Sequence, residues 1–262
     1  MNDTPLYSSL IIKTFMEYLG AHYPGLDMKT ILDYSGMTIY QLNDEGHWFN
    51  QNQVDRFHDI VVRLTGNPDI AKAAGRFAPF SKALGVMLHY VSGFITPGAA
   101  YMVMGKLYRQ VSRACLLETR TLNNNQVEIT VRPKPGVEEK PYQCENRQGA
   151  FESITKLLVG KFADIDHPVC LHKGGNLCQY IISWENTRSS VWKRISYYTT
   201  FLSLSACIIL IWVFSGKYAF VISSFALLLI LSIILRTSML EKKELRNILK
   251  SSGGIAENLL DQ

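Results

Sequence analysis

The chain has 262 residues, of which 47% are hydrophobic and 19% charged, and its formal net charge at pH 7 is +5. This composition excludes a disordered, collagen-like or small disulfide-scaffold protein, and the length suits one large domain or two modest ones. Part of the positive charge flanks a long apolar stretch between Ile195 and Leu235. The charge therefore says more about membrane orientation than about nucleic acid, and we expect no nucleic-acid partner.

Residues 1–98 are predicted to form a helical N-terminal subdomain. Their apolar residues recur at helical spacing in several segments, as with Phe15 and Leu19, which lie about one turn apart. The pair Thr96-Pro97 combines a favoured capping residue with a proline suited to the first helical position. A further helix should therefore begin there.

Residues 99–190 are predicted to form an α+β subdomain with antiparallel strands. Alternation of apolar and polar residues indicates a β-hairpin over 116–132. A helical period then covers 148–162, and a second hairpin is expected with strands at 169–172 and 177–184. The order of helical bundle, hairpin, helix and hairpin is typical of the α+β class.

The stretch 195–235 is predicted to be a transmembrane helical hairpin. It contains two apolar segments, each of roughly the twenty residues that a bilayer-spanning helix needs, separated by a polar turn with Lys217. Because basic residues flank the stretch on both sides, the positive-inside rule places both termini in the cytoplasm. We expect a multi-pass protein of the cell inner membrane, with 236–262 as a cytoplasmic helical stalk for signalling. The alternative is a helical hairpin buried in a larger core.

Three cysteines and a histidine cluster near the second hairpin. Cys144 precedes the helix that leads into the hairpin, Cys170 and Cys178 lie in its two strands, and His167 stands just before Cys170. Cytosolic thiols rarely form disulfides, and thiolates with an imidazole suit a tetrahedral structural zinc ion. The alternative is that the cysteines pack as small hydrophobic side chains. No nucleophile signature with histidine and carboxylate is present, so a catalytic cysteine is not expected.

The hairpin sequence HPVCLHKGGNLCQYIISW resembles the closing segment of the 4-vinyl reductase-like domain family. Members of this family that sense phenolic compounds hold a zinc ion near the effector pocket. The resemblance implies Cys144, His167, Cys170 and Cys178 as the zinc ligands, with His167 in place of the family's acidic residue. The helical sequence over 31–70 is similar to the start of small-molecule sensing domains in bacterial regulators.

Methionine and tyrosine residues gather on the two predicted helices before the first hairpin. Such side chains can line an adaptable, mostly apolar ligand pocket. The predicted ligand-binding residues are Met87, Tyr90, Tyr101, Met104 and Tyr108. The alternative is that they belong to an ordinary hydrophobic core. The neighbouring His89 could ligate heme iron, although no attachment motif accompanies it.

Together these features predict a membrane-anchored cytoplasmic small-molecule sensor, the input module of a bacterial signal-transduction protein, without catalytic activity of its own. Its expected partners are a small apolar or aromatic ligand, the membrane, a second copy in a homodimer, and a downstream signalling domain or partner. Its expected cofactor is structural zinc. One alternative is a membrane-associated enzyme or carrier for a hydrophobic substrate related to tetrapyrrole metabolism. Another is a scaffold assembled through the membrane hairpin.

Overall fold

The computed structural model of the chain describes residues 4–83, 96–185, 198–202, 205, 231–232, 235–236 and 238–239. The chain divides into two compact units, and every helix and strand named below lies in the first, whose described residues end at Trp184. Of the second unit, only short helical pieces are described.

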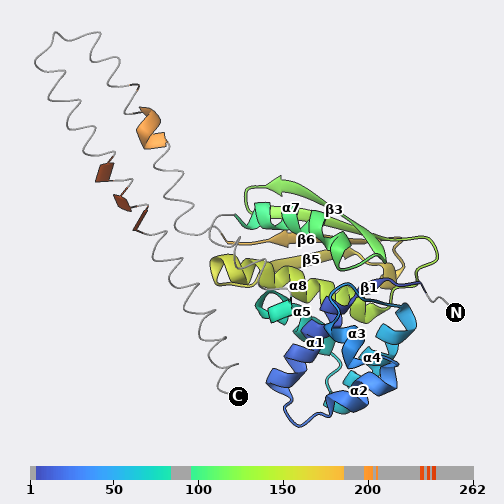
Figure 1. Cartoon of the computed structure of the whole chain (residues 1–262). Coiled ribbons are helices and arrows are strands. Elements are labelled where there is room, and N and C mark those ends of the chain that lie inside the picture. Colours follow the sequence, from blue (N-terminus) through green and yellow to red (C-terminus); the bar gives the residue numbers. More distant parts are fainter. Residues whose placement is uncertain are drawn as a thin grey trace, which may run out of the picture. The chain divides into compact units, whose positions relative to one another are not determined.

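The N-terminal part is a bundle of helices with one short strand pair (Figure 1). Its helices are α1 (Ser9–His22), α2 (Met28–Ser35), α3 (Ile39–Asn43), α4 (Gln51–Thr65), α5 (Ile70–Phe77) and the 3-10 turn η1 (Ala78–Phe80). The strands β1 (Tyr7–Ser8) and β2 (Trp48–Phe49) pair antiparallel and join the start of the chain to the segment before α4.

Local sequence explains where these helices begin and end. The Ser8 side chain caps α1, and Asn50 and Gln53 form a reciprocal capping box at the start of α4. Gly36 ends α2 and Gly66 ends α4, each with a φ of 65°, a conformation that glycine adopts without steric cost.

The second part is a four-stranded antiparallel sheet with helices on one face (Figure 1). Its elements are α7 (Pro97–Leu107), η2 (Tyr108–Gln110), β3 (Cys115–Asn123), β4 (Gln126–Pro133), α8 (Pro141–Val159), β5 (Asp164–Val169), η3 (Leu171–Lys173) and β6 (Cys178–Ser183). The strand order is β3-β4-β6-β5, so β3 and β5 form the two edges of this sheet.

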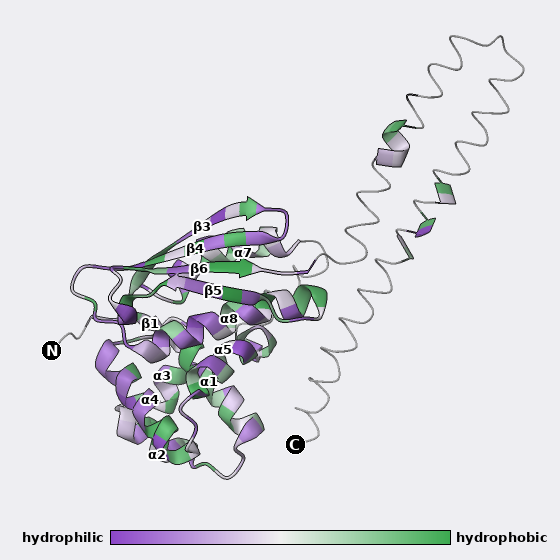
Figure 2. Ribbon diagram, turned by 180° about the vertical axis from the view of Figure 1, so that it is seen from behind, coloured by the Kyte–Doolittle hydropathy of each residue, from purple (hydrophilic) through white to green (hydrophobic). Residues whose placement is uncertain are grey.

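The strands alternate in hydropathy, which gives the sheet one buried face (Figure 2). Val127, Ile129 and Val131 of β4 are fully buried, as are Tyr180 and Ile182 of β6. Helices α7 and α8 pack against this face, and the N-terminal helices lie beyond α8 (Figure 1). The opposite face of the sheet carries mostly polar and charged side chains.

Helices α5 and α8 cross at two glycines and thereby join the bundle to the sheet. A Cβ on Gly75 would collide with the carbonyl oxygen of Asn146, and a Cβ on Gly149 would collide with that of Lys72. At the same crossing, the carboxylate of Glu152 pairs with Lys72 at 2.9 Å and with Arg76, both of α5. The absence of two side chains therefore allows the backbones to approach closely.

The observed strands follow the predicted alternation in the first hairpin and differ in the second. The prediction places the first strand of the second hairpin at 169–172, whereas β5 ends at Val169 and a 3-10 turn follows. Pro168 has no backbone N–H, and the ladder between β5 and β6 shifts register across it. Because β5 is an edge strand, it tolerates this proline. The strand therefore begins at Asp164, before the predicted start at Val169.

The predicted fold class needs one correction. The α+β arrangement is observed, but within the described ranges no helix combines the length and apolarity needed to cross a bilayer. The predicted transmembrane hairpin over 195–235 and the stalk over 236–262 lie almost entirely outside the described residues. The transmembrane hairpin, and with it the placement in the cell inner membrane, is therefore not retained.

Candidate functional site

The fold brings together the four residues that the sequence singled out as metal ligands. Cys144 lies in the first turns of α8, His167 in β5, Cys170 just after β5, and Cys178 at the start of β6. One sulfur or ring nitrogen from each of them lies within 4.8 Å of the others. We refer to these four residues as the Cys/His cluster; their side chains come from three elements that are separate in sequence.

The turn between β5 and β6 positions two of the cysteines. The backbone N–H groups of Lys173 and Gly175 both donate to the Cys170 carbonyl, at 3.0 and 2.9 Å. Gly174 has a φ of 88°, and a Cβ on Gly175 would approach the Cys170 carbonyl oxygen to 2.8 Å. The Gly-Gly pair therefore allows the tight turn that holds Cys170 beside Cys178.

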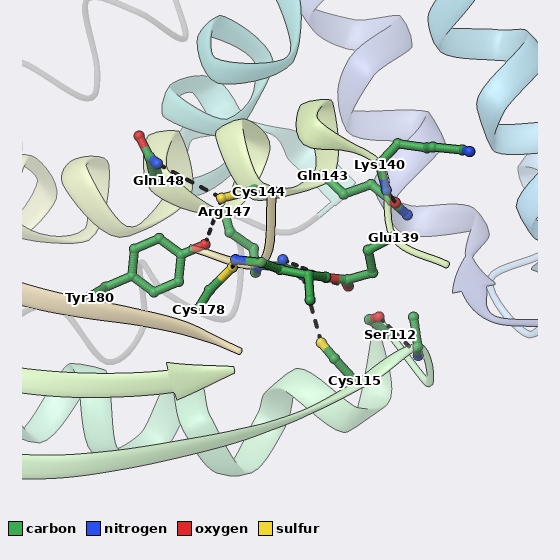
Figure 3. A network of polar contacts seen from close by, with 12 residues as sticks. Ser112, Cys115, Glu139, Lys140, Gln143, Cys144, Arg147, Gln148, Cys178 and Tyr180 are labelled. Atoms are coloured by element: carbon green, nitrogen blue, oxygen red, sulfur yellow. Dashed lines mark hydrogen bonds and ion pairs between the residues drawn. The ribbon is translucent and has the colours of Figure 1, made fainter. Parts of the chain in front are cut away.

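Figure 3 shows polar contacts from Gln148 and Tyr180 to the Cys144 sulfur of the cluster. The Leu171 N–H donates to the Cys178 sulfur at 3.4 Å, and the Tyr180 hydroxyl lies 3.0 Å from the Cys144 sulfur. A hydrogen bond from the Cys144 thiol lowers the pKa of Cys178, and the same bond together with burial raises the pKa of Cys144. The pair thus favours a thiolate on Cys178 and a proton on Cys144.

The donor set determines what this cluster can do chemically. Three thiols and an imidazole are soft or borderline ligands, which suit transition-metal ions rather than calcium or magnesium. His167 stacks on Tyr180 with 4.2 Å between ring centroids, and the Gln148 amide lies 3.0 Å from its Nδ1. Its Nε2 is buried and has no partner among the described residues.

A buried ion pair lies next to the cluster (Figure 3). Arg147 of α8 donates through both terminal nitrogens to Glu139, each at 2.7 Å, and both side chains are almost fully buried. Arg147 also reaches the sulfur of Cys115 at 3.7 Å, and burial raises the pKa of that thiol to about 11. Sequence reasoning missed this pair, because an Arg and a Glu at this spacing look like solvated charges.

The predicted ligand-binding residues of α7 and η2 contact the hydrophobic core. Tyr101 is fully buried; its hydroxyl donates to the Phe151 carbonyl at 2.7 Å and shares a hydrogen bond with Thr155 at 2.7 Å. Met104 and Tyr108 pack against the same core. The other two predicted residues, Met87 and Tyr90, lie outside the described residues, as does His89.

The opposite face of α7 borders an open groove of about 400 Å³. Its described lining residues are Met102, Gly105, Lys106, Arg109, Leu117 and Thr119. The first four recur at a spacing of three and four along the helix and η2, so they share one side of it, and the last two face them from β3. This spacing is the sequence signal that could have identified the groove.

A second, smaller cavity of about 40 Å³ lies between the N-terminal helices and α8. Its lining includes His58 and Arg147, and each presents a buried nitrogen that has no partner among the described residues. His58 stacks on Tyr142 with 4.0 Å between ring centroids. A cavity of this size has room for very few water molecules.

Comparison with known proteins gives one family and one fold. A family model described as the arabinose-binding domain of the AraC transcription regulator, N-terminal, matches residues 25–167. No curated protein matches.

Similar solved structures are H-NOX proteins. An H-NOX protein from S. oneidensis in the Fe(II)NO ligation state has a TM-score of 0.54 and 16% identity, covering 68% of this chain and 99% of that one. A structure from work on heme distortion in the H-NOX family has a TM-score of 0.52 and 15% identity, covering 68% and 95%. An oxygen-binding H-NOX domain related to soluble guanylate cyclases has a TM-score of 0.51 and 15% identity, covering 68% and 95%. These likenesses show the fold.

The comparisons correct two predictions from the sequence. The matching family and the similar folds are not 4-vinyl reductase-like domains, so that resemblance is not retained. The hairpin HPVCLHKGGNLCQYIISW is a short segment, whereas the family match extends over residues 25–167. The similar structures are described by their iron and heme rather than by zinc, so structural zinc is not retained as the cofactor.

Heme does not fit the described residues either. The smaller cavity of about 40 Å³ is far below the roughly 300 Å³ at which pockets for larger ligands begin. Heme iron needs an axial histidine, cysteine, tyrosine or methionine. Among the described residues that line the open groove, only Met102 is of these types, and that side chain is 38% exposed at the rim. We therefore derive no function through heme.

Proposed function

Because the chain belongs to the family of the arabinose-binding domain of AraC transcription regulators, we propose that it is the small-molecule input module of a signal-transduction protein. The ligand that we propose is a small molecule with an apolar or aromatic body. The observation that carries this proposal is the groove between α7 and β3.

The groove has the size and the lining expected of a ligand site. Its volume of about 400 Å³ falls within the roughly 300 to 1,000 Å³ of typical small-molecule pockets. Met102 and Leu117 provide apolar walls, and Thr119 adds a hydroxyl. Such a mixture of apolar surface with few polar groups is typical of sites that bind small organic molecules.

The groove also lies where a ligand could affect the rest of the first unit. Helix α7 forms one of its walls, and Tyr101 on the other face of α7 bonds directly to α8. Helix α8 in turn crosses α5 at Gly75 and Gly149. A ligand that favours one position of α7 would therefore bias the packing of α8, which is the requirement for signalling.

A thermal-shift screen of the full chain tests the proposal. The compounds are phenols, naphthalene derivatives, fatty acids and tetrapyrroles, together with arabinose, which the family description names. A compound that binds only the native state raises the melting temperature, and the stabilisation grows with the logarithm of its concentration once that concentration exceeds Kd. The tetrapyrrole arm also tests the alternative of a carrier for such a substrate.

A pair of tryptophan variants then locates the site. Met102→Trp places a larger ring in the groove and should abolish the ligand-induced shift. Val103→Trp is the matched control, since Val103 is 41% exposed on the same helix and does not line the groove, whereas Met102 is 38% exposed. A shift that survives Met102→Trp would place the ligand elsewhere, and the absence of any shift in the screen would contradict the sensor function.

We also propose that the Cys/His cluster binds a soft metal ion, whose identity we leave open. The grouping of four donor atoms within 4.8 Å supports this proposal. Elemental analysis of the full chain should find a metal in the wild type and less of it in Cys178→Ser. Cys115→Ser, which alters a buried thiol outside the cluster, should keep the metal. A metal-free, folded wild type would contradict the site.

The division into subdomains 1–98 and 99–190 is kept as a proposal. Two separate groups of buried hydrophobic residues support it: one lies almost entirely before residue 98 and the other entirely after it. Homodimerisation and a downstream signalling domain or partner stay predictions from the sequence.

A further inference from the structure

We infer that the groove between α7 and β3 selects molecules that carry one acidic group, a carboxylate or a phosphate ester, on an apolar body. This inference rests on the proposed sensor function and names the class of ligand. Its basis is a pair of cations, Lys106 and Arg109, that line the groove together.

The two cations are placed side by side and are free to bind. Lys106 is in the last turn of α7 and Arg109 follows in η2, so their three-residue spacing brings both side chains to one side of the helix. The side chain of neither residue has a hydrogen bond or an ion pair with any residue that the structure describes. Both are exposed at the rim, where an incoming anion can reach them.

No described acidic side chain competes for these cations within the groove. The six described lining residues include no aspartate or glutamate. Glu118 is adjacent in sequence to the lining residues of β3, but strand alternation directs it to the opposite face of the sheet. There it pairs with Arg132 at 2.7 Å. The described lining of the groove therefore carries a net positive charge.

The Thr119 hydroxyl in the groove wall offers a hydrogen bond to a ligand oxygen. The Thr119 hydroxyl is buried and has no hydrogen-bond partner among the described residues. Gly105 lies directly against it, because a Cβ on Gly105 would stand 2.6 Å from the Thr119 oxygen. A buried hydroxyl without a partner is unfavourable, so a ligand oxygen that reaches it would gain an otherwise missing bond.

The apolar side chains of the groove limit the class of ligand further. Met102 and Leu117 leave room for a ring or a short aliphatic chain beside the cations. Two cations match one carboxylate or phosphate group rather than the many phosphates of a nucleic acid, whose binding needs a larger basic surface. Basic residues in a last helical turn also interact favourably with the helix dipole, so the test must measure the ligand and not stability alone.

Isothermal titration of the full chain with four probes tests the inference. The probes are naphthoate, naphthyl phosphate, naphthamide and inorganic phosphate. Naphthamide keeps the ring without the charge, and inorganic phosphate keeps the charge without the ring. The proteins are the wild type, the double variant Lys106→Ala with Arg109→Ala, Lys106→Arg, Met102→Trp, and Lys29→Ala as a control on an exposed lysine of α2.

Naphthoate or naphthyl phosphate should bind the wild type about tenfold more tightly than naphthamide, because charge-assisted hydrogen bonds are stronger than neutral ones. The preference should decrease in salt, since both cations are exposed. It should vanish in the double variant while naphthamide binding changes little, and Lys106→Arg and Lys29→Ala should retain it. The comparison of the two acids decides between carboxylate and phosphate ester.

The outcomes separate the two proposals. Equal binding of naphthoate, naphthyl phosphate and naphthamide, lost in Met102→Trp, would overturn the acidic-ligand inference and leave the sensor function standing. Equal binding of inorganic phosphate and naphthyl phosphate would overturn the apolar body. A failure of all four probes, together with a negative thermal-shift screen, would contradict the proposed function itself.

Discussion

At the scale of single residues, a buried charge makes the stability of the fold sensitive to substitution. Arg147 and Glu139 are 4% and 7% exposed and share two hydrogen bonds of 2.7 Å, so neither side chain can turn to water when its partner is removed. Breaking a buried pair leaves one uncompensated charge, whereas replacing both partners by apolar groups does not. Single and double substitutions of this pair therefore test whether the two charges are buried and paired.

The variant Arg147→Met should lower the free energy of unfolding by about 3–5 kcal/mol, because Glu139 is left buried without its partner. Adding Glu139→Leu should recover much of that loss. Arg132→Met, which breaks the exposed pair with Glu118, should cost less than about 1 kcal/mol. Urea denaturation of the variants measures these differences in the free energy of unfolding. A double variant no more stable than Arg147→Met would contradict the buried ion pair of Arg147 and Glu139.

His58 predicts a dependence of stability on pH. Burial lowers its pKa, and this effect outweighs the opposing charges of Asp55 and Asp59. Because the unfolded histidine has the higher pKa, near 6.5, the unfolded state binds more protons as the pH falls below about that value. The contribution to stability is therefore present above the unfolded pKa and lost as the pH falls toward the folded pKa.

The measurement compares urea midpoints at about pH 7.5 and pH 5.5, which lie on either side of the ordinary histidine pKa. His58→Gln should reduce the loss of stability at the lower pH. His22→Gln, which changes an exposed histidine at the end of α1, should keep the loss seen in the wild type. An unchanged loss in His58→Gln would show that His58 is not its source.

At the scale of elements, the crossing of α5 and α8 depends on the absence of side chains. Gly149→Ala places a Cβ against the backbone carbonyl of Lys72, and backbone cannot move aside as a side-chain tip can. We expect a loss of about 1–3 kcal/mol or more, as in other overpacked cores. Gly20→Ala in α1 meets nothing within 4 Å and should stabilise the protein by up to about 1 kcal/mol. Equal effects would contradict the close crossing.

Sequence periodicity predicted the elements better than it predicted their faces. Alternation located β3 and β4, because each has one buried side. The described ligand residues that the sequence predicted, Tyr101, Met104 and Tyr108, contact the core, and the groove lies on the side of Lys106 and Arg109. A helix does not reveal which of its sides meets a partner. That depends on the sheet beside it, which is a long-range contact.

The Cys/His cluster was predicted from the sequence as a group, and the structure brings its members together from α8, β5, the turn after β5, and β6. The buried pair of Arg147 and Glu139 was not predicted, since only tertiary packing buries them. The same holds for the α5–α8 crossing. Its two glycines are far apart in sequence, and nothing local marks them as partners.

At the scale of the whole first unit, the connection between groove and bundle runs through Tyr101. This residue faces away from the groove, and its hydroxyl bonds to Phe151 and Thr155 of α8. If ligand binding in the groove stabilises α8, Tyr101→Phe should weaken that effect on α8 and leave the binding itself nearly intact. The lost hydrogen bonds should cost roughly 1 kcal/mol each in stability.

Hydrogen exchange of the full chain with and without naphthoate measures the transmission. In the wild type, ligand should slow exchange in α7 and also in α8, since bound ligand stabilises the arrangement that it favours. In Tyr101→Phe, protection of α7 should persist while protection of α8 falls. Val103→Ala, which alters an exposed position of the same helix, should behave as the wild type. Protection of α8 that survives Tyr101→Phe would show that the signal reaches α8 through the sheet rather than through this hydroxyl.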